Sequence, residues 1–216
     1  MSFQKKDFIE IEFTGKIKDG AIFDSNIKED LIQLNPKENP KPFIFCLGEG
    51  MFLKGIDDFL IGKEIGEYTI ELSPSNAFGL RVPEMIQKVP SKIFREQKLN
   101  PVIGAVFNFD GRVAKVLSVS GGRVIVDFNH PLAGKEVVYK VKVLRKLDDI
   151  KEKIKSFLNF LFRRDLSFSI ESNKVILEVE KNLIQFVKIF QEKFKEVFNL
   201  ELEAKEIVSD SQKKTQ

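Results

Sequence analysis

Apolar and polar residues alternate through several stretches of the chain, and each stretch predicts a β-strand. The longest alternation runs through residues 7–14, 66–72 and 136–144, with apolar side chains on one face and polar ones on the other. We therefore expect three half-buried strands there. Shorter runs predict further strands at residues 21–24, 42–45, 105–109, 112–119, 123–127, 166–170, 175–179 and 200–207.

Helical spacing of apolar residues replaces alternation in three places. We expect a short helix over residues 54–60, a longer amphipathic helix over 149–164, and another that begins after Asn182, with Asn182 as its N-cap. The remaining predictions are a polar, irregular, flap-like loop at 25–40, a linker with a short helical turn at 82–94, and a disordered polar tail at 209–216.

Residues 41–60, KPFIFCLGEGMFLKGIDDFL, combine a strand, a loop and a helix start into one apolar unit. Phe43 and Phe45 point to one face of the expected strand. A loop containing Gly48 and Gly50 follows, and the helix begins just beyond it. Because no acid, base or metal ligand dominates this stretch, a site built here would work by shape and by excluding water.

Charge is distributed unevenly along the 216 residues, whose net charge is +3. Changes near residues 80 and 148 mark candidate domain boundaries. The strand at 136–144 resumes the pattern of the first 80 residues, so the simplest arrangement is one domain interrupted by another. The counts of basic and acidic side chains are 9 and 14 in residues 1–80, 8 and 4 in 81–128, 5 and 1 in 129–147, and 13 and 13 in 148–216.

Composition excludes several classes of protein and site. No N-terminal apolar run has the length of a signal peptide or a membrane span, so we expect a cytoplasmic protein without a membrane partner. The single cysteine, Cys46, precludes an intramolecular disulfide and is expected as a buried thiol. The single histidine, His130, argues against a His-based metal site or a Ser-His-Asp triad. We expect His130 to hold a domain junction from a loop.

Four motifs occur in order along the chain: TGKIKDGAIFDSN at 14–26, PFIFCLGEGMFLKGIDDFLIGKEIGE at 42–67, SPSNAFG at 73–79 and DFNHPLAGKEVVYKVKV at 127–143. Together they resemble the FKBP-type peptidyl-prolyl isomerases, in particular the long-chain, SlyD-like branch of bacteria and archaea. The last motif is the most branch-specific, because it resembles the point at which the chain re-enters the isomerase domain after an insertion. The resemblance covers residues 3–147.

This resemblance implies an α+β fold in which a curled antiparallel FKBP sheet wraps a short helix. It adds an inserted small all-β flap domain and a C-terminal α-β-β-α-β domain, which looks like the extra domain of long archaeal relatives. The implied boundaries are 1–80 plus 129–147 for the isomerase domain, 81–128 for the flap domain and 148–208 for the C-terminal domain, followed by the tail at 209–216.

The resemblance also implies a pocket between sheet and helix. Asp24 would lie at its mouth, Ile56 would form its floor, and the backbone N–H of Leu53 would donate to a ligand carbonyl. Many relatives carry Tyr where this chain has Phe13 and Phe78, so two hydroxyls are missing here. The implied catalytic residues are Asp24, Phe45, Phe52, Leu53 and Tyr139, and the implied substrate-binding residues are Phe13, Phe23, Met51, Ile56, Phe78 and Leu132.

The implied function is X–Pro isomerisation combined with chaperone activity on unfolded or nascent polypeptides. The inserted domain would hold these clients near the pocket, and no cofactor or metal is expected. Two alternatives stay open. The missing hydroxyls would suit a holdase that binds without turnover. The basic balance of 81–128 would suit an RNA- or ribosome-associated factor, but the basic residues are scattered without an aromatic RNA-binding signature, so nucleic acid is not an expected partner.

The C-terminal domain is expected to make a protein contact, either by forming a homodimer or by capturing clients. Phe160 and Phe162 fall off the main apolar face of its first helix, which would leave aromatic surface exposed. The alternative is that both rings pack on the adjacent strands.

Overall fold

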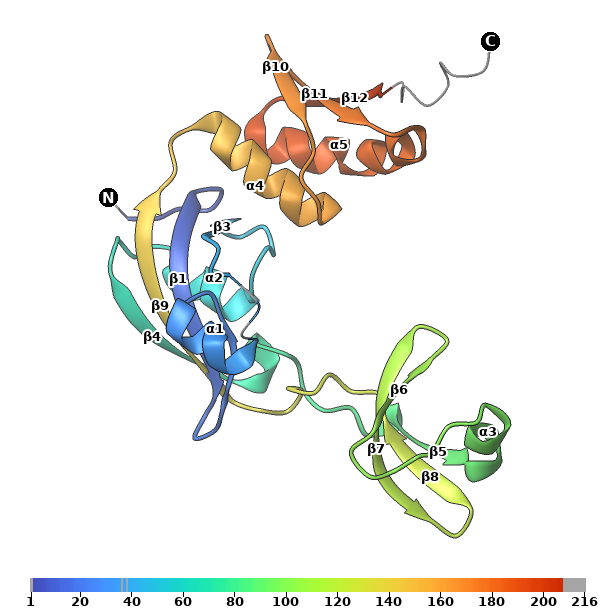
Figure 1. Cartoon of the computed structure of the whole chain (residues 1–216). Coiled ribbons are helices and arrows are strands. Elements are labelled where there is room, and N and C mark those ends of the chain that lie inside the picture. Colours follow the sequence, from blue (N-terminus) through green and yellow to red (C-terminus); the bar gives the residue numbers. More distant parts are fainter. Residues whose placement is uncertain (1, 36, 38, 208–216) are drawn as a thin grey trace, which may run out of the picture.

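The computed structural model describes residues 2–35, 37 and 39–207. Its strands form three separate sheets, of five, four and three strands, and helices lie between and beside them (Figure 1). Mixed helices and mainly antiparallel sheets confirm the predicted α+β class. Within the described ranges, every helix is too short or too polar to span a lipid bilayer.

The central sheet has the strand order β2-β1-β9-β4, and β3 pairs with the edge of β1 opposite β9. All its pairings are antiparallel. Helix α2 (Lys54–Leu60) packs on it through the buried side chains of Ile56 and Leu60, as predicted for this segment. The strands are β1 (Phe8–Ile17), β2 (Ile22–Ser25), β3 (Phe43–Cys46), β4 (Glu67–Leu72) and β9 (Val137–Lys146).

Helix α1 (Lys28–Leu34) occupies part of segment 25–40, where the prediction of an irregular loop is wrong. Its Asp30 carboxylate accepts hydrogen bonds from the hydroxyls of Thr14 and Ser25 in neighbouring strands, and Leu31 is buried. No side chain caps its N-terminus. Tertiary contacts therefore stabilise this helix, and the local sequence gives little sign of it.

The four-stranded sheet has the order β5-β8-β7-β6. The sequence predicted three strands here and missed β5, which lies in the segment interpreted as a linker. As an edge strand, β5 tolerates its terminal proline and shows little alternation. The elements are η2 (Pro83–Met85), β5 (Ile86–Pro90), α3 (Ser91–Glu96), β6 (Val106–Phe109), β7 (Arg112–Ser120) and β8 (Arg123–Asp127).

This four-stranded sheet has its own small core, separate from that of the rest of the molecule. Its tight hairpin follows the predicted Asp110-Gly111 pair, both of which have positive φ, as a two-residue hairpin turn requires. We call residues 83–128 the β module. The buried residues of its core are Phe94, Ala114, Val116, Val124 and Val126.

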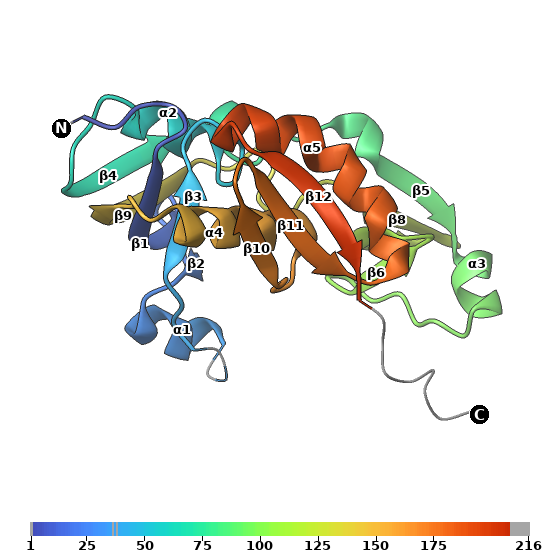
Figure 2. The same ribbon diagram turned by 90° about the horizontal axis from the view of Figure 1, so that it is seen from above.

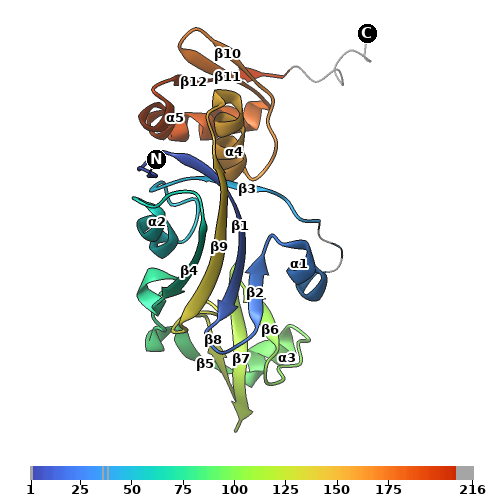
Figure 3. The same ribbon diagram turned by 90° about the vertical axis from the view of Figure 1, so that its left-hand side faces the viewer.

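The C-terminal part follows the predicted order of helix, two strands, helix and strand. Viewed from above, its three strands lie side by side over α4 (Figure 2), and both helices lie between this sheet and the central sheet (Figure 3). Asn182 does not cap the second helix, because a 3₁₀ turn places Leu183 at that position. The elements are α4 (Ile150–Phe162), β10 (Phe168–Glu171), β11 (Lys174–Val179), η3 (Lys181–Leu183), α5 (Ile184–Phe198) and β12 (Glu201–Glu206). The predicted tail lies outside the described residues.

Strand β1 is buried on both faces, which corrects the expectation of a half-buried strand. Phe8, on the face that alternation assigned to solvent, is 2% exposed. Its ring contacts those of Phe157 on α4 and Phe198 on α5, at centroid distances of 6.3 and 5.5 Å. The C-terminal helices therefore share one hydrophobic core with the central sheet. Phe160 and Phe162 are half-buried, and Phe162 packs against Phe190 of α5.

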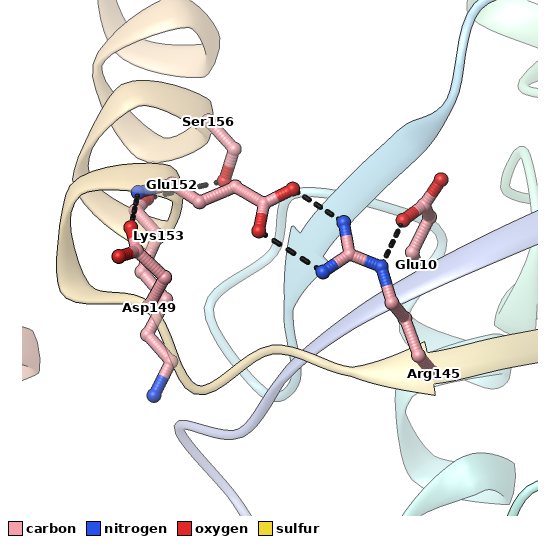
Figure 4. Close-up of polar contacts among 6 residues, drawn as sticks. All are labelled: Glu10, Arg145, Asp149, Glu152, Lys153 and Ser156. Atoms are coloured by element: carbon pink, nitrogen blue, oxygen red, sulfur yellow. Dashed lines mark hydrogen bonds and ion pairs between the residues drawn. The ribbon is translucent and has the colours of Figure 1, made fainter.

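A charge network joins α4 to strands β1 and β9 at this junction (Figure 4). Arg145, near the end of β9, donates from Nε to Glu10 at 2.6 Å and from its terminal nitrogens to Glu152. Asp149 caps the helix by accepting from the Glu152 backbone N–H at 2.8 Å. The hydrogen bonds from Arg145 hold the pKa of the Glu152 carboxyl below its usual value.

Candidate active site

Aromatic rings from strands β1, β2, β3 and β9 meet those of two loops beside the central sheet. The closest pairs are Phe43–Phe52 at 4.9 Å and Phe13–Phe52 at 5.0 Å between ring centroids. Rings at these separations attract each other when tilted or edge-on, so the contacts form one continuous unit. We call it the aromatic cluster; it consists of Phe13, Phe23, Phe43, Phe45, Phe52, Phe78 and Tyr139.

The aromatic cluster has a buried layer and a half-exposed layer. Phe13, Phe45 and Tyr139 are at most 5% exposed, and Ile56, in the same hydrophobic core, is fully buried. The half-buried rings are Phe23, Phe43, Phe52 and Phe78. A ligand that contacts these outer rings would meet apolar surface backed by side chains sealed from solvent.

Gly15 lets the Tyr139 ring lie directly over strand β1. A Cβ atom at residue 15 would come within 2.8 Å of Tyr139 Cε1, which is closer than real Cβ contacts allow. Strand register places Gly15 opposite Tyr139 on one side and opposite Asp24 on the other. Burial, followed by the negative charge of Asp24, raises the pKa of the Tyr139 phenol. The phenol therefore stays neutral beside the only carboxylate predicted for the mouth of the site.

Hydrogen bonds within the loop between β3 and α2, and between this loop and α2, stabilise its conformation. The Cys46 backbone N–H donates to the sulfur of Met51 at 3.2 Å. The carboxylate of Asp57, on α2, accepts from the backbone N–H groups of Gly48 and Gly50. Burial outweighs these bonds and raises the pKa of Asp57 to about 6. These contacts fix Met51, which is 8% exposed, and so set the path of the next residues, Phe52 and Leu53.

Two further predicted site residues, Leu53 and Leu132, are half-buried. The Leu53 carbonyl accepts the first bonds of α2, from Ile56 and Asp57, whereas no hydrogen bond among the described residues uses the Leu53 N–H. Leu132 is half-buried in the loop before β9 and lies outside the main hydrophobic cluster.

The two singly occurring residue types take structural positions. Cys46 is fully buried, which confirms the prediction, and burial raises the pKa of its thiol. His130 is exposed in its loop, and its ring stacks parallel to that of Phe78 at 4.8 Å. This stack links the loop after the β module to the outer layer of the aromatic cluster.

Two contributors to the site were not among the predicted site residues, although Phe43 was named in the apolar stretch at 41–60. Phe43 contacts Phe13, Phe45 and Phe52, and its alternation with Phe45 was the available signal. Gly15 could not be recognised as a site residue from the sequence, because only the register between β1 and β9 places it opposite Tyr139. Within residues 2–35, 37 and 39–207, no group of three or more His, Cys, Asp or Glu side chains could hold a metal ion.

Comparison with known proteins identifies the family. The chain is 32% identical over 145 residues to a short-type peptidyl-prolyl cis-trans isomerase of Methanocaldococcus jannaschii; the match covers 65% of this chain and 91% of that protein. The chain belongs to the FKBP-type peptidyl-prolyl cis-trans isomerase family. An FKBP-type 16 kDa isomerase of Escherichia coli is also 32% identical, over 66% of this chain and 93% of its own length.

Two family models match this FKBP-type isomerase. The model of the FKBP-type peptidyl-prolyl cis-trans isomerases matches residues 1–99, and that of the FKBP26 IF domain matches residues 87–132. A SlyD protein of Helicobacter pylori is 29% identical over 59% of this chain and 72% of its own length. The predicted SlyD-like FKBP identity is therefore confirmed, and so is the prediction of an isomerase. Neither family model reaches the C-terminal helices.

Proposed function

We propose that the aromatic cluster is where this isomerase rotates X–Pro bonds, and that the β module holds unfolded clients beside it. Phe45, Phe52 and Tyr139 would surround the reacting amide, Asp24 would form the polar edge, and the Leu53 N–H would donate to the ligand carbonyl. The proposed substrate-binding walls and floor are Phe13, Phe23, Met51, Ile56, Phe78 and Leu132.

Desolvation is the proposed source of catalysis. Rotation about a peptide bond faces a barrier of about 18–20 kcal/mol, because resonance gives the C–N bond double-bond character. The twisted transition state has lost this resonance and is less dipolar than either planar form, so water stabilises the planar forms more. A binding surface of rings that excludes water therefore favours the twisted form, and each ~1.4 kcal/mol gained is about tenfold in rate. The rings need no nucleophile or proton transfer for this.

Client binding by the β module is supported by its exposed apolar side chains and by a groove at its base. Val106 and Val113 are 59% and 60% exposed and line a groove of about 530 Å³. His130 also lines this groove, and its ring stacks on Phe78 of the aromatic cluster. This continuity carries the proposal, because a chain held in the groove lies next to the proposed site. Further exposed apolar residues are Leu80 and Val82, just before the module, and Ile93, Val102, Ile103 and Val119 within it.

We further propose the domain limits given by the resemblance, with the module as an insert. Two chain segments connect the module to the central sheet, and hydrogen bonds join them to each other. The Val82 N–H donates to Asn129 Oδ1 at 2.8 Å, and Asn129 Nδ2 donates to the Val82 carbonyl at 3.0 Å. The Gly134 N–H donates to the Gly79 carbonyl at 2.9 Å. The ends of an excised insert therefore lie close together, and a short Gly-rich bridge should join them without strain.

Replacing residues 81–128 by such a bridge tests the proposal. All proposed catalytic residues lie outside the deleted segment, so turnover of an X–Pro tetrapeptide should persist. Turnover of an unfolded protein with a slow prolyl step should fall far more, because the client is no longer concentrated near the site. Equal loss on both substrates would contradict client capture by the module, and no loss on either would assign the module another role.

A holdase without turnover is the second candidate, favoured by Phe13 and Phe78, whose positions carry hydroxyls in many relatives. The same tetrapeptide assay separates the two. Suppression of aggregation without acceleration of the cis–trans exchange would support the holdase.

A further inference from the structure

A groove of about 710 Å³ lies between β3 and α4, and of its lining residues only Phe43 and Met51 belong to the site proposed above. Residues 41–44 and Met51 form one wall. The opposite wall belongs to the C-terminal part, where groove residues recur at helical spacing along one face of α4. These are Glu152, Lys155, Ser156, Asn159, Phe160 and Arg163, with Asp165 just beyond the helix.

Strand β3 turns an unpaired edge toward this groove. The Leu47 N–H donates to the Asp7 carbonyl at 2.9 Å, so these two residues form a hydrogen-bonded pair. Hydrogen-bonded pairs occur at every second residue of an antiparallel ladder, so Phe45 and Phe43 are the next residues of β3 that exchange backbone hydrogen bonds with β1. The backbone groups of the alternate residues, Ile44 and Cys46, must point away from β1. Cys46 bears this out, because its N–H donates to Met51.

The same geometry leaves Ile44 without a backbone partner among the described residues. Its N–H and C=O face outward from β3, and no hydrogen bond to either is present in the described part of the chain. Successive side chains of a strand point to opposite faces, so a space lined by all of residues 41–44 lies alongside the strand edge. An unpaired edge of this kind is a template for another extended chain.

We propose that this groove binds the segment of a client polypeptide that flanks the X–Pro bond, added as an extended strand to β3. The inference rests on the proposed function. Phe43 connects the two sites, because it lines the groove and its ring lies 4.9 Å from that of Phe52. A client with its proline over the aromatic cluster would pass across Phe43 and enter the groove. The C-terminal domain is then part of the substrate-binding surface.

The wall formed by α4 suits a polar main chain better than an apolar side chain. Asn159 donates from Nδ2 to Asp165 at 3.0 Å, whereas its Oδ1 is buried without a donor among the described residues. Charges of both signs, from Lys155, Arg163 and Asp165, line the same wall. Recognition through main-chain bonds depends little on sequence, as clients with many sequences require.

Two variants of Ile44 test the edge directly. Ile44→Pro removes the outward N–H but no hydrogen bond to β1, and proline is tolerated at such edge positions. Ile44→Ala keeps the N–H and shortens the side chain, so it is the matched control. On the other wall, Ser156→Trp should fill the groove, and Lys151→Trp on the exposed side of α4 is its control.

The measurement compares kcat/KM on an X–Pro tetrapeptide with that on peptides extended by about five residues on either side, roughly 17 Å of strand. Ile44→Pro should lower kcat/KM on the better extended peptide about fivefold, the effect of one hydrogen bond, and Ser156→Trp at least as much. Both variants should leave kcat/KM on the tetrapeptide unchanged. Equal losses for Ile44→Pro and Ile44→Ala, or extended peptides that never outperform the tetrapeptide, would overturn the inference.

Hydrogen exchange of the Ile44 amide gives a readout that does not depend on turnover. It should slow when the wild-type full-length protein binds an extended peptide and not when it binds the tetrapeptide. An unchanged exchange rate at saturating extended peptide refutes the groove. A protein that protects Ile44 but fails to isomerise either peptide refutes the proposed function and leaves the groove standing as a binding site.

Discussion

Replacing Gly15 by alanine should disturb the aromatic cluster at its most crowded contact. A Cβ atom there would lie 2.8 Å from both Cε1 and Cζ of Tyr139 and 3.1 Å from its hydroxyl oxygen. Ordinary van der Waals contact begins at 3.4 Å, so the ring or the strand must move by about 0.6 Å. Tyr139 is 1% exposed and has Phe13, Phe23 and Phe52 around it, so it has little room to move.

The expected cost of this overpacking is about 1–3 kcal/mol of unfolding free energy. Turnover should suffer as well, because a ring displaced by a large fraction of an ångström no longer matches the twisted amide. A loss of about tenfold in kcat/KM on an X–Pro tetrapeptide is expected, with native-like circular dichroism.

Urea unfolding and tetrapeptide turnover, measured in two backgrounds, test the reasoning. In a Tyr139→Leu background the clash is absent, so Gly15→Ala should cost less than about 0.5 kcal/mol. The difference between the two backgrounds is the coupling between residues 15 and 139. Equal costs with and without the tyrosine ring would refute the assigned contact.

Three further outcomes are expected. Burial raises the pKa of Asp57 from 3.8 to about 6, so the charged form of Asp57 destabilises the folded state increasingly as pH rises through that range. Between about pH 4 and pH 7, the unfolding free energy of Asp57→Asn should therefore rise by up to about 3 kcal/mol relative to that of wild type. Parallel pH profiles of the two proteins in urea unfolding would contradict this. Tyr139→Ala should reduce tetrapeptide turnover more than Asp24→Ala; the reverse order would place electrostatics at the mouth above desolvation. The sequence left open a homodimer formed through the C-terminal part. If it forms, the exposed Ile189, at 69%, and Phe186, at 54%, are the expected contact. Light scattering should then show Ile189→Glu as a monomer, and a wild type that is itself monomeric would exclude the homodimer.

Local patterns predicted the elements whose environment is set by their own residues. Strand β9 buries Val137, Tyr139, Val141 and Val143, as its alternation indicated, and α2 matches its predicted bounds. Elements stabilised from elsewhere escaped prediction. Helix α1 depends on bonds from Asp30 to two strands, and the second buried face of β1 exists only because Phe157 and Phe198 cover Phe8.

The candidate site shows the same division. The rings of Phe23, Phe45, Phe52 and Tyr139 could be named from the motifs, because each motif places an aromatic residue at a fixed position. Gly15 could not, since its role depends on which residue of β9 lies opposite it. The free edge at Ile44 likewise depends on the pairing register of β3 and on the position of α4. The residues next to Ile44 in the sequence predict neither.

Exchange spectroscopy of an X–Pro tetrapeptide, with catalytic amounts of the protein and a chelator present, tests the central claim most directly. Cis–trans exchange should become much faster than the uncatalysed process, which takes on the order of tens to hundreds of seconds, and Tyr139→Ala should largely abolish the acceleration. An exchange rate equal to that of the peptide alone would contradict isomerisation in the aromatic cluster.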